Sequence, residues 1–126
     1  MNRRRRARLR EDLQRELAAI VEFESRDPIV QAAFPTVMDV RLSPDARYAR
    51  VFVAAGATID RAELERALEH DRGFYRSLLA ERLDLRHTPE LRFEIDETVE
   101  RAMRLEEIIR ANDASTHPDR GDDQEP

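Results

Sequence analysis

Residues 37–53, VMDVRLSPDARYARVFV, alternate apolar and polar side chains on either side of a short polar segment. This alternation predicts two strands, because successive side chains of a strand point to opposite faces of a sheet. Ser43, Pro44 and Asp45 separate the two strands and are typical turn residues. The stretch therefore predicts an antiparallel hairpin with one apolar face. The residues of that face are Met38, Val40, Leu42, Ala49, Val51 and Val53.

The opposite face of the hairpin mixes charged and aromatic side chains. Its residues are Asp39, Arg41, Tyr48, Arg50 and Phe52. Aromatic residues are common on ordinary sheet surfaces because they favour strands. Arginines interleaved with aromatic residues also provide the chemistry that stacks on bases and contacts phosphates. Both interpretations stay open for the aromatic residues, and Arg50 is a candidate RNA-binding residue.

A helix is expected before the hairpin, because apolar residues recur there at helical spacing and Asp27-Pro28 then ends the pattern. Its apolar residues are Leu9, Leu13, Leu17, Ile20 and Val21. Residues 1–7 form a basic N-terminal extension, which is either a solvated end or a phosphate-binding arm. The candidate RNA-binding residues of this region are Arg3, Arg4, Arg5, Arg6 and Arg8.

Two helices, a strand and a last helix are expected after the hairpin. Asp60 opens the first helix, and Glu63 completes a capping box three residues later. The second helix follows Gly73 and buries Phe74, Leu78, Leu79 and Leu83. Residues 91–95 alternate like a strand, and residues 97–110 have helical spacing. Residues 111–126 are acidic and almost without aliphatic side chains, so a disordered tail is expected.

The expected element order is therefore α-β-β-α-α-β-α. A three-stranded sheet with one apolar face needs helices on that face, which predicts a two-layer α+β sandwich. The chain has 126 residues and no linker long enough to divide it, so one domain is expected, spanning residues 8–110.

Gly73 lies between two strongly helical segments and is one of three glycines in the chain. The expected cause is a helix C-cap in the left-handed region, which glycine adopts without steric cost. Such a cap exposes the N-terminus of the next helix, where phosphate binds favourably, and Arg72 and Arg76 flank it. His70 and Asp71 are sequence neighbours and are expected to point about 100° apart on a helix, so no oriented catalytic dyad is predicted.

Composition and charge exclude several classes of function. The chain has no cysteine, its three histidines are scattered, and no glycine-rich phosphate loop is present, so no catalytic residue, metal or cofactor is expected. No membrane span or secretory signal is recognisable. All 22 basic residues are arginine, and the net charge of −5 combines +6 in residues 1–10 with −7 in residues 11–110 and −4 in residues 111–126. A locally basic RNA-binding face remains compatible with this distribution.

Several stretches of the chain resemble the ribosome-binding factor A family, which has a type II KH-like fold. They are LREDLQRELAAIV, VMDVRLSPDARYARVFV, GFYRSLLAERLDLRHTPELRFEID and VERAMRLEEII, which together cover most of residues 8–110 in order. The resemblance implies a helix–kink–helix with an Ala-x-Gly signature in place of the usual KH loop. The corresponding residues are Asp71, Arg72 and Gly73, so this chain has aspartate where the family has alanine.

The resemblance implies a non-enzymatic RNA-binding protein that is monomeric and cytoplasmic. Its implied partner is the free 30S subunit with its 16S rRNA. The resemblance implies that the protein assists late maturation of this rRNA, including 5′-end processing, and that it supports growth in the cold. It implies no membrane and no small-molecule substrate. An alternative from the residues alone is a protein-interaction adaptor that docks on basic ribosomal proteins through the acidic residues 97–126.

Overall fold

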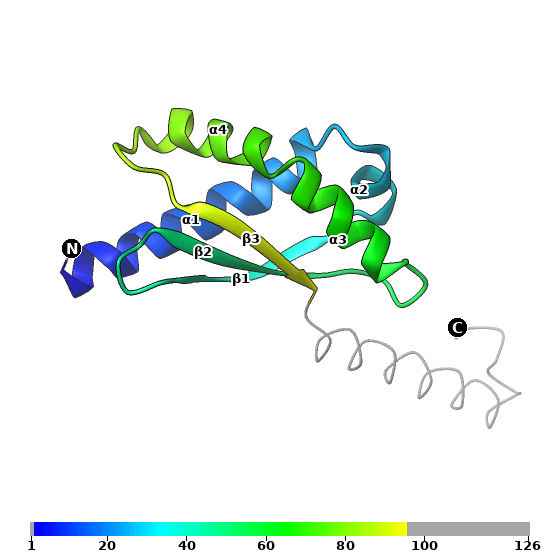
Figure 1. The fold of residues 1–126 in the computed structure, drawn as a ribbon, viewed down its shortest axis with the longest axis horizontal. Coiled ribbons are helices and arrows are strands. Elements are labelled where there is room, and N and C mark those ends of the chain that lie inside the picture. The colour runs from blue at the N-terminus through cyan, green and yellow to red at the C-terminus, as the bar shows by residue number, and fades with distance from the viewer. Residues whose placement is uncertain (1, 96–126) are drawn as a thin grey trace, which may run out of the picture.

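The computed structural model describes residues 2–95, which form four helices packed on one face of a three-stranded sheet (Figure 1). The expected helix at residues 97–110 and the expected tail at 111–126 lie outside the described residues. The α+β class and the position of the helices are confirmed. The elements are α1 (Arg3–Glu24), α2 (Pro28–Ala33), β1 (Thr36–Leu42), β2 (Tyr48–Ala54), α3 (Arg61–His70), α4 (Arg72–Leu83) and β3 (Glu90–Ile95).

The strand order in the sheet is β1-β2-β3. The hairpin pairs β1 with β2 antiparallel, as expected, while β3 pairs with β2 parallel. A parallel neighbour needs a long crossover connection, and the two helices α3 and α4 supply it. In the resulting register Arg50 lies between Arg41 on β1 and Arg92 on β3.

Met38 does not belong to the buried face, contrary to the expectation from strict alternation. The register shifts between Val37 and Asp39, which marks a β-bulge at Met38. A bulge adds one residue to the strand and moves the residues before it to the other face. The Met38 side chain is 42% exposed, whereas Val37 is buried. The other five residues expected on the apolar face of the hairpin are all buried.

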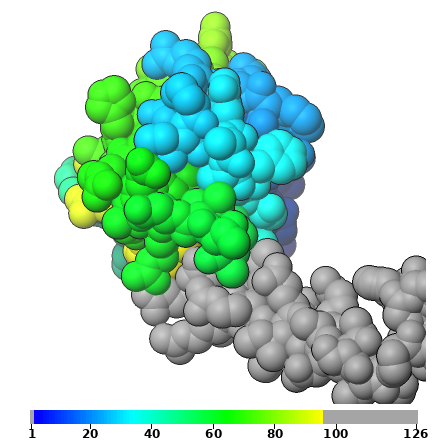
Figure 2. Space-filling model, turned by 90° about the vertical axis from the view of Figure 1, so that its right-hand side faces the viewer, coloured from blue at the N-terminus to red at the C-terminus, as the bar shows by residue number. Residues whose placement is uncertain are grey.

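Helix α1 agrees with the expected apolar stripe, but α2 was not expected. Asp27 accepts a hydrogen bond from the Ile29 backbone N–H, and Pro28 occupies the first turn. The Asp-Pro pair therefore both ends one helix and starts the next, and the six residues of α2 are too few to show helical periodicity. Figure 2 looks at the end of the molecule where α2 packs beside α3.

The core contains a tyrosine that the sequence pattern did not single out. Tyr75 on α4 is fully buried, and its hydroxyl lies 2.7 Å from Ser25 Oγ, just beyond the end of α1. Its ring meets the Phe93 ring of β3 edge to face, at 5.6 Å between centroids. Burial raises the pKa of Tyr75. Of the residues expected on the buried side of α4, Leu79 is fully buried, while the other three are only partly buried.

Gly73 is not the left-handed C-cap that its position predicted. It lies in the first turn of α4, and no glycine of residues 2–95 has a positive φ. The break between α3 and α4 falls at Asp71, whose φ of −95° and ψ of 13° end one helix and begin the other. A Cβ atom built on Gly73 meets no heavy atom within 4 Å. Neither backbone conformation nor space therefore requires glycine here.

We expect Gly73→Ala to stabilise the protein by about 0.5–1 kcal/mol, because alanine reduces the entropy of the unfolded chain and suits the helix better. The measurement is the urea midpoint, followed by circular dichroism. A loss of stability would show that glycine is needed at the kink.

Candidate RNA-binding surface

Three segments meet at the end of the molecule that carries the N-terminus (Figure 1). They are residues 3–10 of α1, the β1–β2 turn at residues 43–47 and the α4–β3 loop at residues 84–89. We call these three segments the basic end. Arg6 of α1 reaches the turn through Ser43, and the Glu90 backbone N–H donates to the Arg47 carbonyl at 2.8 Å. Hydrogen bonds thus connect the turn to α1 and to the first residue of β3, which directly follows the α4–β3 loop.

Arg6 is a structural anchor within this end. Its guanidinium donates to the carbonyl oxygen of Ser43, at 3.3 Å from Nε and 3.2 Å from Nη2, and to that of Leu42. The side chain is half-buried. Because its donors are occupied by the turn, Arg6 holds the first turns of α1 in place and has less capacity for phosphate than its neighbours.

We expect Arg6→Ala to destabilise the protein by about 1–2 kcal/mol, because a charged donor to two carbonyl groups is lost. The free energy of unfolding in urea measures this loss, and hydrogen exchange of the first α1 amides should become faster. Arg4→Ala removes an exposed neighbour of the same type and should cost less than about 0.5 kcal/mol. Equal effects of the two changes would contradict the anchoring role.

The side chains of the other candidate arginines of α1 have no partner among residues 2–95. None of them forms an ion pair or a side-chain hydrogen bond within residues 2–95, and all are exposed. The first turn contains no acidic residue, so these cations add to the positive end of the helix dipole. This accumulation of uncompensated positive charge favours an anionic partner. The four residues are Arg3, Arg4, Arg5 and Arg8.

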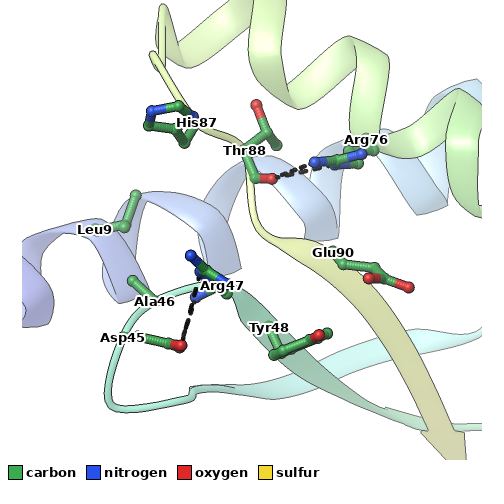
Figure 3. A pocket seen from close by; sticks show the side chains of 9 residues that line it. All are labelled: Leu9, Asp45, Ala46, Arg47, Tyr48, Arg76, His87, Thr88 and Glu90. Carbon is green, nitrogen blue, oxygen red and sulfur yellow. Dashed lines mark hydrogen bonds and ion pairs between the residues drawn. The ribbon is translucent and has the colours of Figure 1, made fainter.

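A cleft of about 520 Å³ opens between the three segments of the basic end (Figure 3). Arg76 of α4 borders it, and its Nε and Nη2 atoms donate to the Thr88 carbonyl at 3.1 and 2.8 Å. Arg47 forms only a loose ion pair with Asp45, at 3.9 Å between Nε and Oδ2. A hydrogen bond from Ser43 lowers the pKa of Asp45. The lining residues are Leu9, Asp45, Ala46, Arg47, Tyr48, Arg76, His87, Thr88 and Glu90.

Arg50 lies elsewhere, on the sheet face that the helices leave uncovered. Its guanidinium forms two hydrogen bonds with Glu94 of β3, at 2.8 and 3.1 Å, and this pairing lowers the pKa of Glu94. It also lies 5.0 Å from the centre of the Phe52 ring, while Arg41 approaches the same ring at 5.2 Å. The charge of Arg50 is therefore compensated within the sheet.

The kink between α3 and α4 also has its charges paired. Arg72 Nη1 lies 2.9 Å from a Glu69 oxygen and 4.0 Å from a Glu90 oxygen. Asp71 is buried, so its carboxylate is not presented to solvent where an RNA phosphate would approach. The charge of Arg72, which precedes Gly73, is thus compensated by two neighbouring carboxylates.

His70 and Asp71 are closer than the helical geometry predicted. His70 Nδ1 lies 3.3 Å from Asp71 Oδ1, because the helix breaks at Asp71. The His70 side chain is nevertheless 83% exposed, and no other side chain of residues 2–95 hydrogen-bonds to its ring. In the same part of the chain, no three potential ligands group to hold a metal ion, and no helix has the length and apolar character to span a membrane.

The family model of ribosome-binding factor A matches residues 5–109 of the chain. Ribosome-binding factor A of Thermomicrobium roseum is 41% identical over 107 residues, which cover 84% of this chain and 81% of that protein. The crystal structure of the factor from Thermus thermophilus superposes with a TM-score of 0.63 at 31% identity, covering 71% of this chain and 93% of that one.

A second similar structure is a homology model of the Thermus thermophilus ribosome-binding factor A, fitted into the cryo-EM map of a complex between the 30S subunit and the factor. It has a TM-score of 0.59 and 32% identity, and the match covers 71% of this chain and 92% of that one. The family match covers the turn, the α4–β3 loop and the kink, and it begins at residue 5 within the first segment of the basic end. The chain belongs to the ribosome-binding factor A family.

Proposed function

We propose that this protein binds the free small ribosomal subunit through its basic end and assists late maturation of 16S rRNA, including processing of its 5′ end. The observation that carries the proposal is a set of four arginines that have no ion-pair partner within residues 2–95 and lie on a helix anchored by Arg6. The guanidinium group of arginine binds phosphate bidentately, and a helix held in place by Arg6 fixes the orientation of these groups. The relative in the complex with the 30S subunit supports the same partner.

In this proposal the protein acts by binding rRNA and catalyses no reaction. Phosphate contacts position the protein on rRNA, and the shape of the RNA selects the site. The protein then acts as a folding aid or a checkpoint during assembly, is monomeric and cytoplasmic, and supports growth in the cold. Its remaining candidates, Arg50, Arg72, Gly73 and Arg76, are secondary contacts in this proposal, because the three arginines already have intramolecular partners.

The test is co-sedimentation of the full chain with purified ribosomal particles. We expect the protein in the free small-subunit fraction and not with translating ribosomes. Raising the salt concentration should release it steeply, because several arginines displace counterions. Binding that is absent, or that does not change with salt, would contradict the proposal.

Absence of enzymatic activity is tested separately with precursor 16S rRNA. Incubation with the purified protein should leave the RNA length unchanged. Cleavage that disappears in His70→Ala would contradict the non-enzymatic proposal and would assign chemistry to the His70–Asp71 contact.

A further inference from the structure

We propose that the cleft at the basic end binds one unpaired nucleotide of an RNA strand. The inference rests on the proposed function, since it specifies what part of the RNA this end receives. It adds a pocket for a single base to the general attraction that the α1 arginines exert on phosphates.

The cleft has the size and the rigidity that a nucleotide site needs. Its volume of about 520 Å³ lies within the range of ordinary ligand sites and is large enough for one nucleotide. Two of its walls are fixed by hydrogen bonds, from Arg76 to the Thr88 carbonyl and from the Glu90 backbone N–H to the Arg47 carbonyl. The site is therefore formed before any ligand arrives, which lowers the entropic cost of binding.

The chemistry of the lining suits a base better than a bare phosphate. Figure 3 shows Leu9 and His87 at one side of the cleft, Arg76 and Glu90 at the other, and Arg47 between them. Leu9 supplies an apolar surface, and the exposed His87 ring is a stacking surface. The lining offers hydrogen-bond donors on the guanidinium groups of Arg47 and Arg76. It offers acceptors on the carboxylates of Asp45 and Glu90. A base edge carries both kinds of group, whereas phosphate carries only acceptors.

The phosphates beside such a base have a partner close to the cleft. Arg5 precedes Leu9 by four residues, so the two side chains lie on the same side of α1. Arg5 has no partner within residues 2–95, while Arg47 has only its loose contact with Asp45. A strand whose base enters the cleft would therefore pass its backbone along α1. Paired bases are stacked inside a helix, so only an unpaired nucleotide can enter.

The test compares a fluorescein-labelled single-stranded RNA of mixed sequence with a duplex of the same length, by fluorescence anisotropy at one salt concentration. Phosphate attraction alone favours the duplex, which has the higher charge density. We expect the full chain to bind the single strand about 5-fold more tightly, and His87→Ala to remove that preference by weakening single-strand binding about 5- to 10-fold. Duplex binding should stay unchanged in this variant.

Matched variants test whether the preference for single-stranded RNA depends on the residues of the cleft. Arg47→Ala should act like His87→Ala, whereas His70→Ala and Arg66→Ala change exposed residues of the same types on α3 and should leave the preference intact. A preference for the duplex, or equal losses in His70→Ala and His87→Ala, would overturn the cleft proposal.

Co-sedimentation with small subunits, run in parallel, separates this proposal from the function on which it rests. Subunit binding without any single-strand preference overturns the cleft alone. A single-strand preference that depends on His87, without subunit binding, supports the cleft and contradicts the proposed function. Absence of both kinds of binding overturns both.

Discussion

Replacing Arg3, Arg4, Arg5 and Arg8 together by glutamine should weaken binding to small subunits by about two orders of magnitude near 0.1 M salt, because each lost phosphate contact no longer releases a counterion. The slope of log affinity against log salt should become shallower by about 3. Arg6 is left in place because it anchors the helix. The measurement is co-sedimentation or anisotropy with labelled subunits over a range of salt concentrations.

A control with the same change in net charge distinguishes local contacts from overall charge. Four arginines away from the basic end, Arg15, Arg26, Arg61 and Arg66, are replaced by glutamine in the same way. Their replacement should change the affinity by less than about 3-fold, since charges more than a Debye length from the RNA are largely screened. A comparable loss in both quadruple variants would mean that net charge alone controls binding.

The second large effect is on folding. Tyr75→Ala should lower the free energy of unfolding by about 3–5 kcal/mol, because a fully buried aromatic ring leaves a cavity. That loss approaches the whole stability of a small domain, which is about 5–15 kcal/mol. Urea unfolding followed by circular dichroism measures it, and a largely unfolded variant would be in agreement.

Two further variants show how much of the stabilisation by Tyr75 comes from its ring and how much from its hydroxyl group. Tyr75→Phe keeps the ring and removes the hydroxyl group, and Ser25 keeps its 2.7 Å hydrogen bond to the Val21 carbonyl, so a cost of about 1 kcal/mol is expected. Tyr48→Ala changes the second tyrosine of the chain, which is 41% exposed, and should cost less than about 1 kcal/mol. A cost of Tyr75→Phe as large as that of Tyr75→Ala would locate the stabilisation in the hydroxyl group.

Local patterns predicted most of the fold correctly. The hairpin, the apolar stripe of α1, the Asp60 cap of α3 and the inward residues of β3 each follow from neighbours within a few positions. The predictions that were wrong depend on contacts between distant parts of the chain, which local patterns do not contain. The bulge at Met38 depends on pairing with β2, and the α3–α4 break falls at Asp71, two residues before the glycine that marked it.

The candidate site was less predictable than the fold. The sequence correctly indicated that the α1 end is basic, but it gave no reason to separate Arg6 from its neighbours, because the carbonyls that bind it are 36 and 37 residues away. Arg50 is compensated by Glu94 in the same manner, from 44 residues away. His87 and Arg47 were overlooked because each lies in a polar loop, and only the fold brings them to one cleft.

The contacts that close the basic end are distant along the chain. Arg6 meets Ser43, and the Arg47 carbonyl is joined to the Glu90 N–H. During synthesis from the N-terminus, the arginines of α1 therefore emerge long before the loop that completes the cleft. A partly made chain already has the charge that attracts RNA, but it acquires the pocket only after β3 has paired with β2. Ordering of the cleft is consequently a late event, which reports that the protein itself has finished folding.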